Sequence, residues 1–236
     1  KITRAETVKM IDNAMGELVA AAGVYSGTKA GNVVVNARDA VLSDMTVHGN
    51  LYLTPGIGDG DVTLRNVKVA GTTYVEGGGV NSVKAENTTF GEIVVLKKDG
   101  NVRLVLGKGS SAASIVLSSG AIVENGSETP IGHMTVTDDA DGSQTVTIRG
   151  NVSSLTVDGS VRVLLASGTV AELTTTDRSA GASITVAEGA DIASLIVNAA
   201  ATIDGSGTIG RAAFNAPGAV LARKPAQMTF KDGITA

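Results

Sequence analysis

A short apolar pattern recurs about every twenty residues along most of the chain, and it restricts the fold more than any other feature. The pattern reads apolar-x-x-apolar-x-apolar, as in Val152–Val157, and the middle members of successive copies lie 17 to 26 residues apart. A repeat of this length is typical of solenoids, in which each repeat packs on its neighbours. The nine copies are Leu42/Met45/Val47, Leu64/Val67/Val69, Phe90/Ile93/Val95, Ala112/Ile115/Leu117, Ile131/Met134/Val136, Val152/Leu155/Val157, Val170/Leu173/Thr175, Ile192/Leu195/Val197 and Ile209/Ala212/Phe214.

The spacing within one copy indicates strands rather than helices. Leu155 and Val157 alternate with a variable residue, as in a strand with one buried face. Small or polar residues before Leu155 suit a tight corner. A turn and a second alternating pair follow, as in Val161/Val163 after Gly159 and Leu51/Leu53 after Gly49. The repeat therefore predicts an all-β, right-handed, single-stranded parallel β-helix of about nine coils, roughly 43 Å long.

Composition agrees with a narrow aliphatic core and excludes several classes of protein. Hydrophobic residues make up 43% of the 236 residues, but aromatic residues only 3%. The net charge of −4 gives no basic surface for nucleic acid. The chain has no cysteine, which excludes disulfides and thiolate metal sites. No apolar run is long enough to span a membrane.

The first 22 residues carry the one helical pattern of the chain. Thr3 followed by Glu6 has the spacing of a capping box. Gly23 is a natural stop for such a helix. We expect this helix to cover the open end of the first coil. Its apolar stripe consists of Val8, Ile11, Met15, Leu18 and Val19.

The repeat divides the chain into three parts. Residues 1–23 form the expected capping helix, residues 24–224 the β-helix, and residues 225–236 an exit strand or linker to a following domain. Val33–Val35 reads as an early strand. Flanking domains of the same polypeptide are therefore expected partners.

Two stretches resemble bacterial surface proteins. Thr3-Arg4-Ala5-Glu6 before an amphipathic helix is similar to the closing segment of an S-layer homology (SLH) motif, a module that anchors proteins to cell-wall polysaccharide. Residues 49–83 resemble the β-helical segment that follows SLH motifs in surface proteins of Paenibacillus-type bacteria. The resemblance implies an extracellular location at the cell wall or S-layer. It also implies a polymer-binding remnant at Thr3, Arg4 and Glu6.

Many parallel β-helices cleave polysaccharides, and such chemistry needs carboxylates close together. The residues between the fourth and sixth pattern positions are expected to face outward, and none is acidic. Asp44, Glu92 and Glu172 occupy corners of separate coils. The outward positions are Thr46, Lys68, Val94, Val116, Thr135, Thr156, Thr174, Ile196 and Ala213.

Three of these outward residues are large and apolar where solvent-facing residues are usually polar. Val94, Val116 and Ile196 therefore form a candidate partner-facing patch. The alternative is that these strands are covered on both faces. Tyr52 and Tyr74 follow each other in similar segments and are expected to stack as a cross-strand ladder rather than as a ligand platform.

The remaining polar clusters give weaker signals. Asp138–Gly142 resembles the start of a calcium loop but lacks the later acidic ligand, so an acidic turn is favoured. Gly56–Asp61 lacks the lysine and the helix of a phosphate-binding loop. His48 and His133 are expected to be exposed, without partners at metal-ligand spacing. No cofactor is predicted.

These observations favour a non-catalytic structural spacer or interaction module of a cell-wall-anchored bacterial surface protein. The alternative is an extracellular β-helix that binds or cleaves polysaccharide, as a lyase or glycoside hydrolase. An exposed groove that combines carboxylates with a basic residue would favour the alternative, whereas a smooth surface would favour the spacer.

Overall fold

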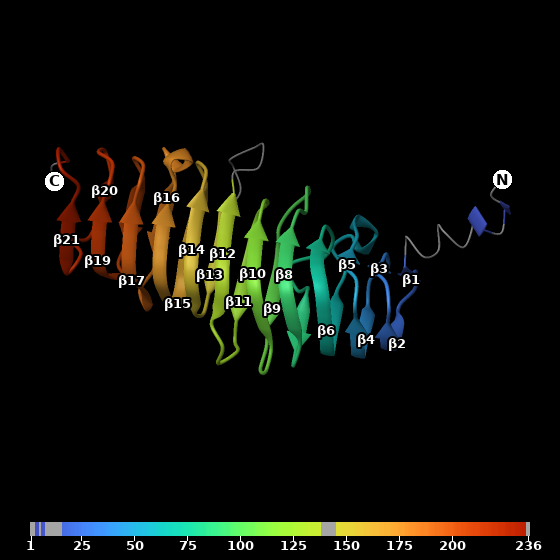
Figure 1. Cartoon of the computed structure of the whole chain (residues 1–236). Coiled ribbons are helices and arrows are strands. Elements are labelled where there is room, and N and C mark those ends of the chain that lie inside the picture. Colours follow the sequence, from blue (N-terminus) through green and yellow to red (C-terminus); the bar gives the residue numbers. More distant parts are fainter. Residues whose placement is uncertain (1–2, 5, 8–15, 138–144, 235–236) are drawn as a thin grey trace.

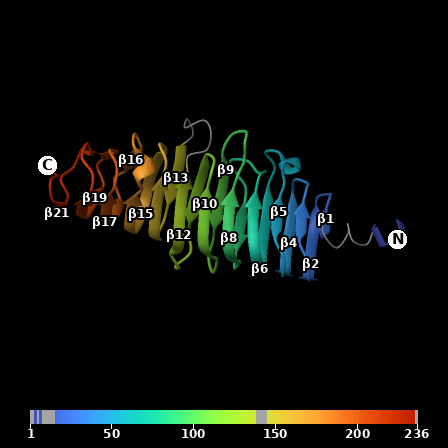
Figure 2. The same ribbon diagram turned by 45° about the horizontal axis from the view of Figure 1, so that its top comes forward.

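The computed structural model describes residues 3–4, 6–7, 16–137 and 145–234, and it is an all-β parallel solenoid of about eleven turns. The strands lie side by side in one long row, with the N-terminus at one end and the C-terminus at the other (Figure 1). The same row is seen in the view turned by 45° (Figure 2). All strand pairs are parallel, as the repeat predicts.

Short strands joined by corners and turns make up nearly the whole described chain. Two single turns of 3₁₀ helix, η1 (Pro55–Ile57) and η2 (Asp177–Ser179), lie in loops. The strands are β1 (Glu17–Val19), β2 (Gly23–Lys29), β3 (Val33–Val35), β4 (Ala40–Val47), β5 (Leu51–Leu53), β6 (Val62–Val75), β7 (Lys84–Glu86), β8 (Thr89–Val95), β9 (Val102–Leu106), β10 (Ser111–Leu117), β11 (Ala121–Asn125), β12 (Ile131–Thr137), β13 (Thr145–Arg149), β14 (Val152–Asp158), β15 (Arg162–Thr175), β16 (Ser183–Val186), β17 (Ala190–Val197), β18 (Thr202–Gly205), β19 (Thr208–Phe214), β20 (Val220–Leu221) and β21 (Gln227–Phe230).

One ladder of paired residues runs the length of the solenoid and sets its register. Its members face inward from Val33 onward, and each pairs with the member of the next coil. Eleven strand spacings separate the first member from the last, which gives a solenoid about 53 Å long. The ladder consists of Glu17, Val33, Leu51, Thr73, Ile93, Ile115, Met134, Leu155, Leu173, Leu195, Ala212 and Met228.

The predicted count of nine coils was too low, because the pattern misses the end coils that contain Glu17, Val33 and Met228. The first two pattern copies were also assigned to the wrong strand. Val69 pairs with Phe90, so the sixth position of the Leu64 copy corresponds to the first position of the Phe90 copy. The true counterparts of Ile93–Val95 are Thr73–Val75 and Leu51–Leu53. The seven copies from Phe90 onward hold the predicted register.

The expectation of a helix over residues 1–22 was wrong for residues 16–22. Glu17–Val19 is strand β1, paired with Val33–Val35, and residue 23 opens strand β2. Val19 is fully buried in the first coil, whereas Leu18 is exposed on the opposite side of the strand. Strand pairing at the solenoid end outweighs the weak helical spacing, because it satisfies backbone groups and buries Val19 together. Val8, Ile11 and Met15 lie outside the described residues.

The predicted capping box at Thr3 is present. The Thr3 backbone N–H donates to Glu6 Oε2 at 2.8 Å, and the Glu6 N–H donates to Thr3 Oγ1 at 3.2 Å. Arg4, Glu6 and Thr7 are helical and exposed. These bonds also hold the pKa of Glu6 below its ordinary value, chiefly through the Thr3 backbone N–H.

One corner of the early coils is built from a stack of Asp and Asn residues in the left-handed backbone region. Asp44, Asn66 and Asn87 have φ values of 50°, 57° and 47°. Asn and Asp tolerate this region better than other non-glycine residues. Asn66 Nδ2 donates to Asp44 Oδ1 at 2.7 Å, and Asn87 donates in turn to Asn66. The side chains of successive coils thus bond along the axis.

The inward ladder predicts a large cost for truncating its central members. Leu155 is fully buried between Met134 and Leu173. We expect Leu155→Ala to lower the free energy of unfolding by about 2–5 kcal/mol in chemical denaturation, because it removes apolar contacts and leaves a cavity. Thr156→Ala, at the neighbouring outward position, is the control and should cost about 1 kcal/mol or less. Equal effects of the two changes would contradict the register.

Thr73 is an inward residue whose replacement is expected to stabilise the protein. It stands in the inward ladder between Leu51 and Ile93, is 2% exposed, and its hydroxyl has no hydrogen-bond partner among the described residues. We expect Thr73→Val to raise the free energy of unfolding by about 1–3 kcal/mol, because valine has nearly the same shape without the unsatisfied hydroxyl. A loss of stability in the same denaturation experiment would show that Thr73 has a polar role.

Candidate functional site

The strands of the inward ladder also carry a second ladder, one residue further along each strand and facing outward. Each of its residues pairs with the next along the axis. Its first six members are aliphatic or aromatic, the next three are threonines, and Leu18 is the most exposed apolar member at 52%. The ladder consists of Leu18, Val34, Tyr52, Tyr74, Val94, Val116, Thr135, Thr156, Thr174, Ile196, Ala213 and Thr229.

The candidate partner-facing patch is only partly contiguous. Val94 and Val116 occupy neighbouring rungs. Ile196 lies four rungs beyond Val116, across the three threonines. The prediction placed Lys68 beside Val94 in this column, but the residue paired with Val94 is Tyr74. The apolar stripe is therefore longer at the N-terminal end than the sequence pattern indicates.

Tyr52 and Tyr74 stack as expected. Their ring centroids are 5.1 Å apart and the ring planes differ by 8°. This separation is close to the strand spacing, so the ring faces are directed along the axis at neighbouring rungs. Asn50 Nδ2 donates to the Tyr52 hydroxyl at 3.0 Å. Because the faces point along the ladder, the pair is a cross-strand contact and not a flat platform for a sugar ring.

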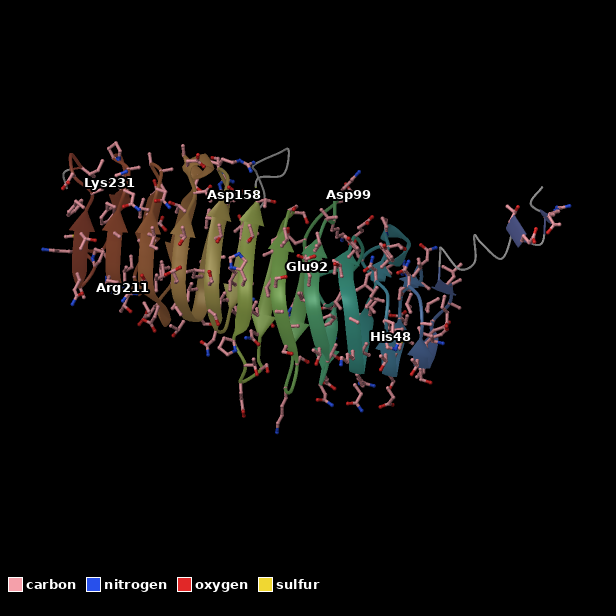
Figure 3. All side chains as sticks on the ribbon, in the orientation of Figure 1. His48, Glu92, Asp99, Asp158, Arg211 and Lys231 are labelled. Atoms are coloured by element: carbon pink, nitrogen blue, oxygen red, sulfur yellow. The ribbon has the colours of Figure 1, made fainter. Side chains whose placement is uncertain are left out.

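A groove of about 360 Å³ opens beside the Tyr52–Val94 part of the outward ladder. Three successive coils contribute to it, through the loop after Leu53, through Glu76 after Val75, and through the loop after Val95. Asp99 lies on a loop that projects beyond the strand ends (Figure 3). The groove is lined by Pro55, Gly58, Asp59, Glu76, Leu96, Lys97, Lys98 and Asp99.

A buried lysine joins the walls of this groove. Lys97 is 5% exposed, and its ammonium group donates to Asp59 Oδ1 at 2.6 Å and to the Gly78 carbonyl at 2.8 Å. Asp59 comes from two coils earlier and Gly78 from one coil earlier. The hydrogen bond and charge of Lys97 hold the pKa of Asp59 below its ordinary value, so this carboxylate is ionised near neutral pH.

The carboxylates singled out from the sequence do not converge. Glu92 and Glu172 face outward in the same column but are four strand spacings apart, roughly 19 Å. The charged residues marked in Figure 3 are likewise spread along the rod. Among the described residues, no group of three or more His, Asp or Glu side chains could hold a metal ion.

The other candidate residues occupy separate places. His48 and His133 are exposed, as predicted, and the His133 ring lies 3.1 Å from Thr135 Oγ1. Asp138–Gly142, the candidate calcium loop, lies outside the described residues. Gly56–Asp61 forms part of the groove wall rather than a phosphate cradle. Thr3, Arg4 and Glu6 are exposed near the N-terminus.

Another part of the solenoid surface carries a charge cluster with a structural role. Glu124 accepts from Arg103 at 2.5 Å and from Arg149 at 2.8 Å, and these residues lie on the neighbouring strands β9, β11 and β13. The hydrogen bond from Arg103 and the charges of both arginines hold the pKa of Glu124 below its ordinary value. The three side chains form ion pairs with one another and so link three successive coils.

The groove was missed at the sequence level, although one signal pointed to it. Inward positions alternate along the strand, and continuing the alternation from Ile93 and Val95 places Lys97 inward. A lysine at an inward position requires an internal partner. That requirement was not drawn from the sequence, because Asp59 and Gly78 lie in loops whose length breaks the repeat.

The chain matches no protein-family model, no curated protein and no solved structure. Among the described residues, no helix has the length and apolar character needed to cross a lipid bilayer.

The Glu124 cluster predicts a pH-dependent contribution to stability. Because folding lowers the pKa of the Glu124 carboxyl, its contribution to stability is present above the ordinary glutamate pKa. This contribution is lost as the pH falls through the pKa of the folded state. We expect Glu124→Gln to lower the melting temperature near neutral pH, and the difference from wild type to shrink in acid. Glu172→Gln, at an exposed position, is the matched control. A difference that stays constant down to acidic pH would contradict the ion-pair role.

Proposed function

We propose that this chain is a non-catalytic spacer and interaction module of a bacterial cell-surface protein. The observation that carries the proposal is the continuous register of about eleven coils, which keeps the two ends of the described chain at opposite ends of a rod. Each coil packs only on its neighbours, and parallel hydrogen bonds run along the axis. A chain of this kind separates whatever precedes it from whatever follows it.

The cell-surface setting is supported by the resemblance of Thr3-Arg4-Ala5-Glu6 to the end of an SLH motif. The Thr3–Glu6 capping box agrees with a helix start at this place. In the proposal, cell-wall polysaccharide is bound through SLH motifs, with Thr3, Arg4 and Glu6 as a remnant of one motif. The rod then carries flanking domains away from the wall.

A second candidate function is favoured by the groove. Carboxylates and lysines gather there, as an enzyme that cleaves polysaccharide would require. Against this, Lys97 is bonded to Asp59 and to a backbone carbonyl, so neither member of the pair is free to exchange a proton with a substrate. Binding without cleavage fits these contacts better than catalysis does.

The spacer proposal is tested by changing the number of coils. Val152 pairs with Val170, so deleting residues 152–169 removes one coil and leaves equivalent positions joined. We expect the shortened protein, and one with this segment duplicated, to fold, with the distance between fluorophores at the two ends changing by about 4.8 Å per coil. Loss of the β circular dichroism signal in both proteins, or an unchanged distance, would contradict the spacer mechanism.

Catalysis is tested separately with the intact protein. We expect no release of reducing ends or unsaturated products from pectin, alginate or β-glucans, with or without calcium, because Lys97 and Asp59 are bonded to each other and are not available for proton transfer. Product formation that disappears in Glu76→Gln or Asp99→Asn, and persists in Glu172→Gln, would establish the enzyme instead.

A further inference from the structure

The groove beside the Tyr52–Val94 part of the outward ladder is formed by residues at equivalent positions of successive coils. Thr54, Glu76 and Leu96 occupy the same position on three successive coils, two residues after the outward ladder. The loops after Thr54 and Leu96 extend the walls on either side of Glu76. The volume of about 360 Å³ falls within the range of pockets that hold small ligands.

The wall is held by an interaction that the core does not need. Lys97 takes an inward position two residues after Val95, where the coils on either side carry Gly77 and Ser119, and removing an ammonium group from water costs free energy. An aliphatic residue there would avoid this cost. The contacts of Lys97 with Asp59 and Gly78 instead fix loops of three coils relative to one another. These hydrogen bonds give the groove a defined shape.

The groove offers polar groups and apolar surface together. Glu76, Lys98 and Asp99 take part in none of the ion pairs found among the described residues, and Lys98 and Asp99 are exposed. Leu96 and Pro55 supply apolar surface between them. Carboxylates accept hydrogen bonds from hydroxyl groups, the ammonium group donates them, and aliphatic side chains pack on C–H faces. Sugar rings present hydroxyl groups and C–H faces in this combination.

We propose that this groove binds a neutral oligosaccharide. Three carboxylates and two ammonium groups line it, so it carries a net charge of −1 on a protein whose total is −4. Like charge disfavours polyuronates such as pectin and alginate fragments. The ligand class therefore differs from the acidic glycans that a lyase would take. The site goes beyond the spacer function and does not depend on it.

In the experiment, oligosaccharides are titrated into the full chain, and binding is monitored by two-dimensional NMR of the backbone amides. The probes are cellohexaose, laminarihexaose and mannohexaose, with hexagalacturonate as the charged comparison. We expect at least one neutral hexaose to shift the amides of residues 55–59, 76 and 96–99. The variant Glu76→Gln/Asp99→Asn should weaken that binding at least about tenfold, or about 1.4 kcal/mol. The control Glu172→Gln/Asp204→Asn, which is exposed and remote from the groove, should bind as wild type does.

Several results would overturn the site. Absence of shifts with all three neutral hexaoses at about 10 mM would do so, since even millimolar affinity is then visible. Shifts that are equal in the groove variant and wild type, or tighter binding of hexagalacturonate, would do so as well. Neither variant changes a buried residue, and their melting curves should match that of wild type. The coil-number experiment is unaffected by any of these outcomes.

Discussion

Every coil of this protein depends on the coils before and after it, because a single coil has too few residues to bury its own apolar side chains. Parallel hydrogen bonds set the spacing, and the inward ladder through Ile93, Leu155 and Leu195 fills the space they enclose. Hydrophobic burial and backbone pairing therefore act along the same axis. A destabilising change in one coil therefore affects its two neighbouring coils first. The low aromatic content follows from the narrow interior.

The same register arranges the surface. Because each strand alternates inward and outward, the residues that face solvent are also stacked in ladders along the axis. The Tyr52–Tyr74 stack, the Arg103–Glu124–Arg149 cluster and the Asp44–Asn66–Asn87 corner are three forms of this stacking. Regular strands place their functional groups in columns, so a pocket with varied chemistry has to come from loops. The groove around Lys97 arises in this way.

Much of the fold could be predicted from the sequence, because the aliphatic repeat directly reflects the inward ladder. The seven copies from Phe90 onward were in the correct register. Leu42/Met45/Val47 fits the same pattern from a neighbouring strand, and spacing alone does not distinguish two strands of one coil. The apolar residues Leu18 and Val19 match a helix as well as a strand, and only pairing with Val34 and Val35 decides between them. The groove depends on loops that the repeat does not describe.

The most direct test of the account is a distance measured along the axis. The chain has no cysteine, so spin labels at Val34→Cys and Ala213→Cys would be the only ones present. These outward positions are nine rungs apart in the ladder. A single solenoid in continuous register predicts one narrow distance distribution near 43 Å by pulsed electron paramagnetic resonance, about nine strand spacings. A broad distribution, or a distance shorter by two or more strand spacings, would contradict a single solenoid in continuous register.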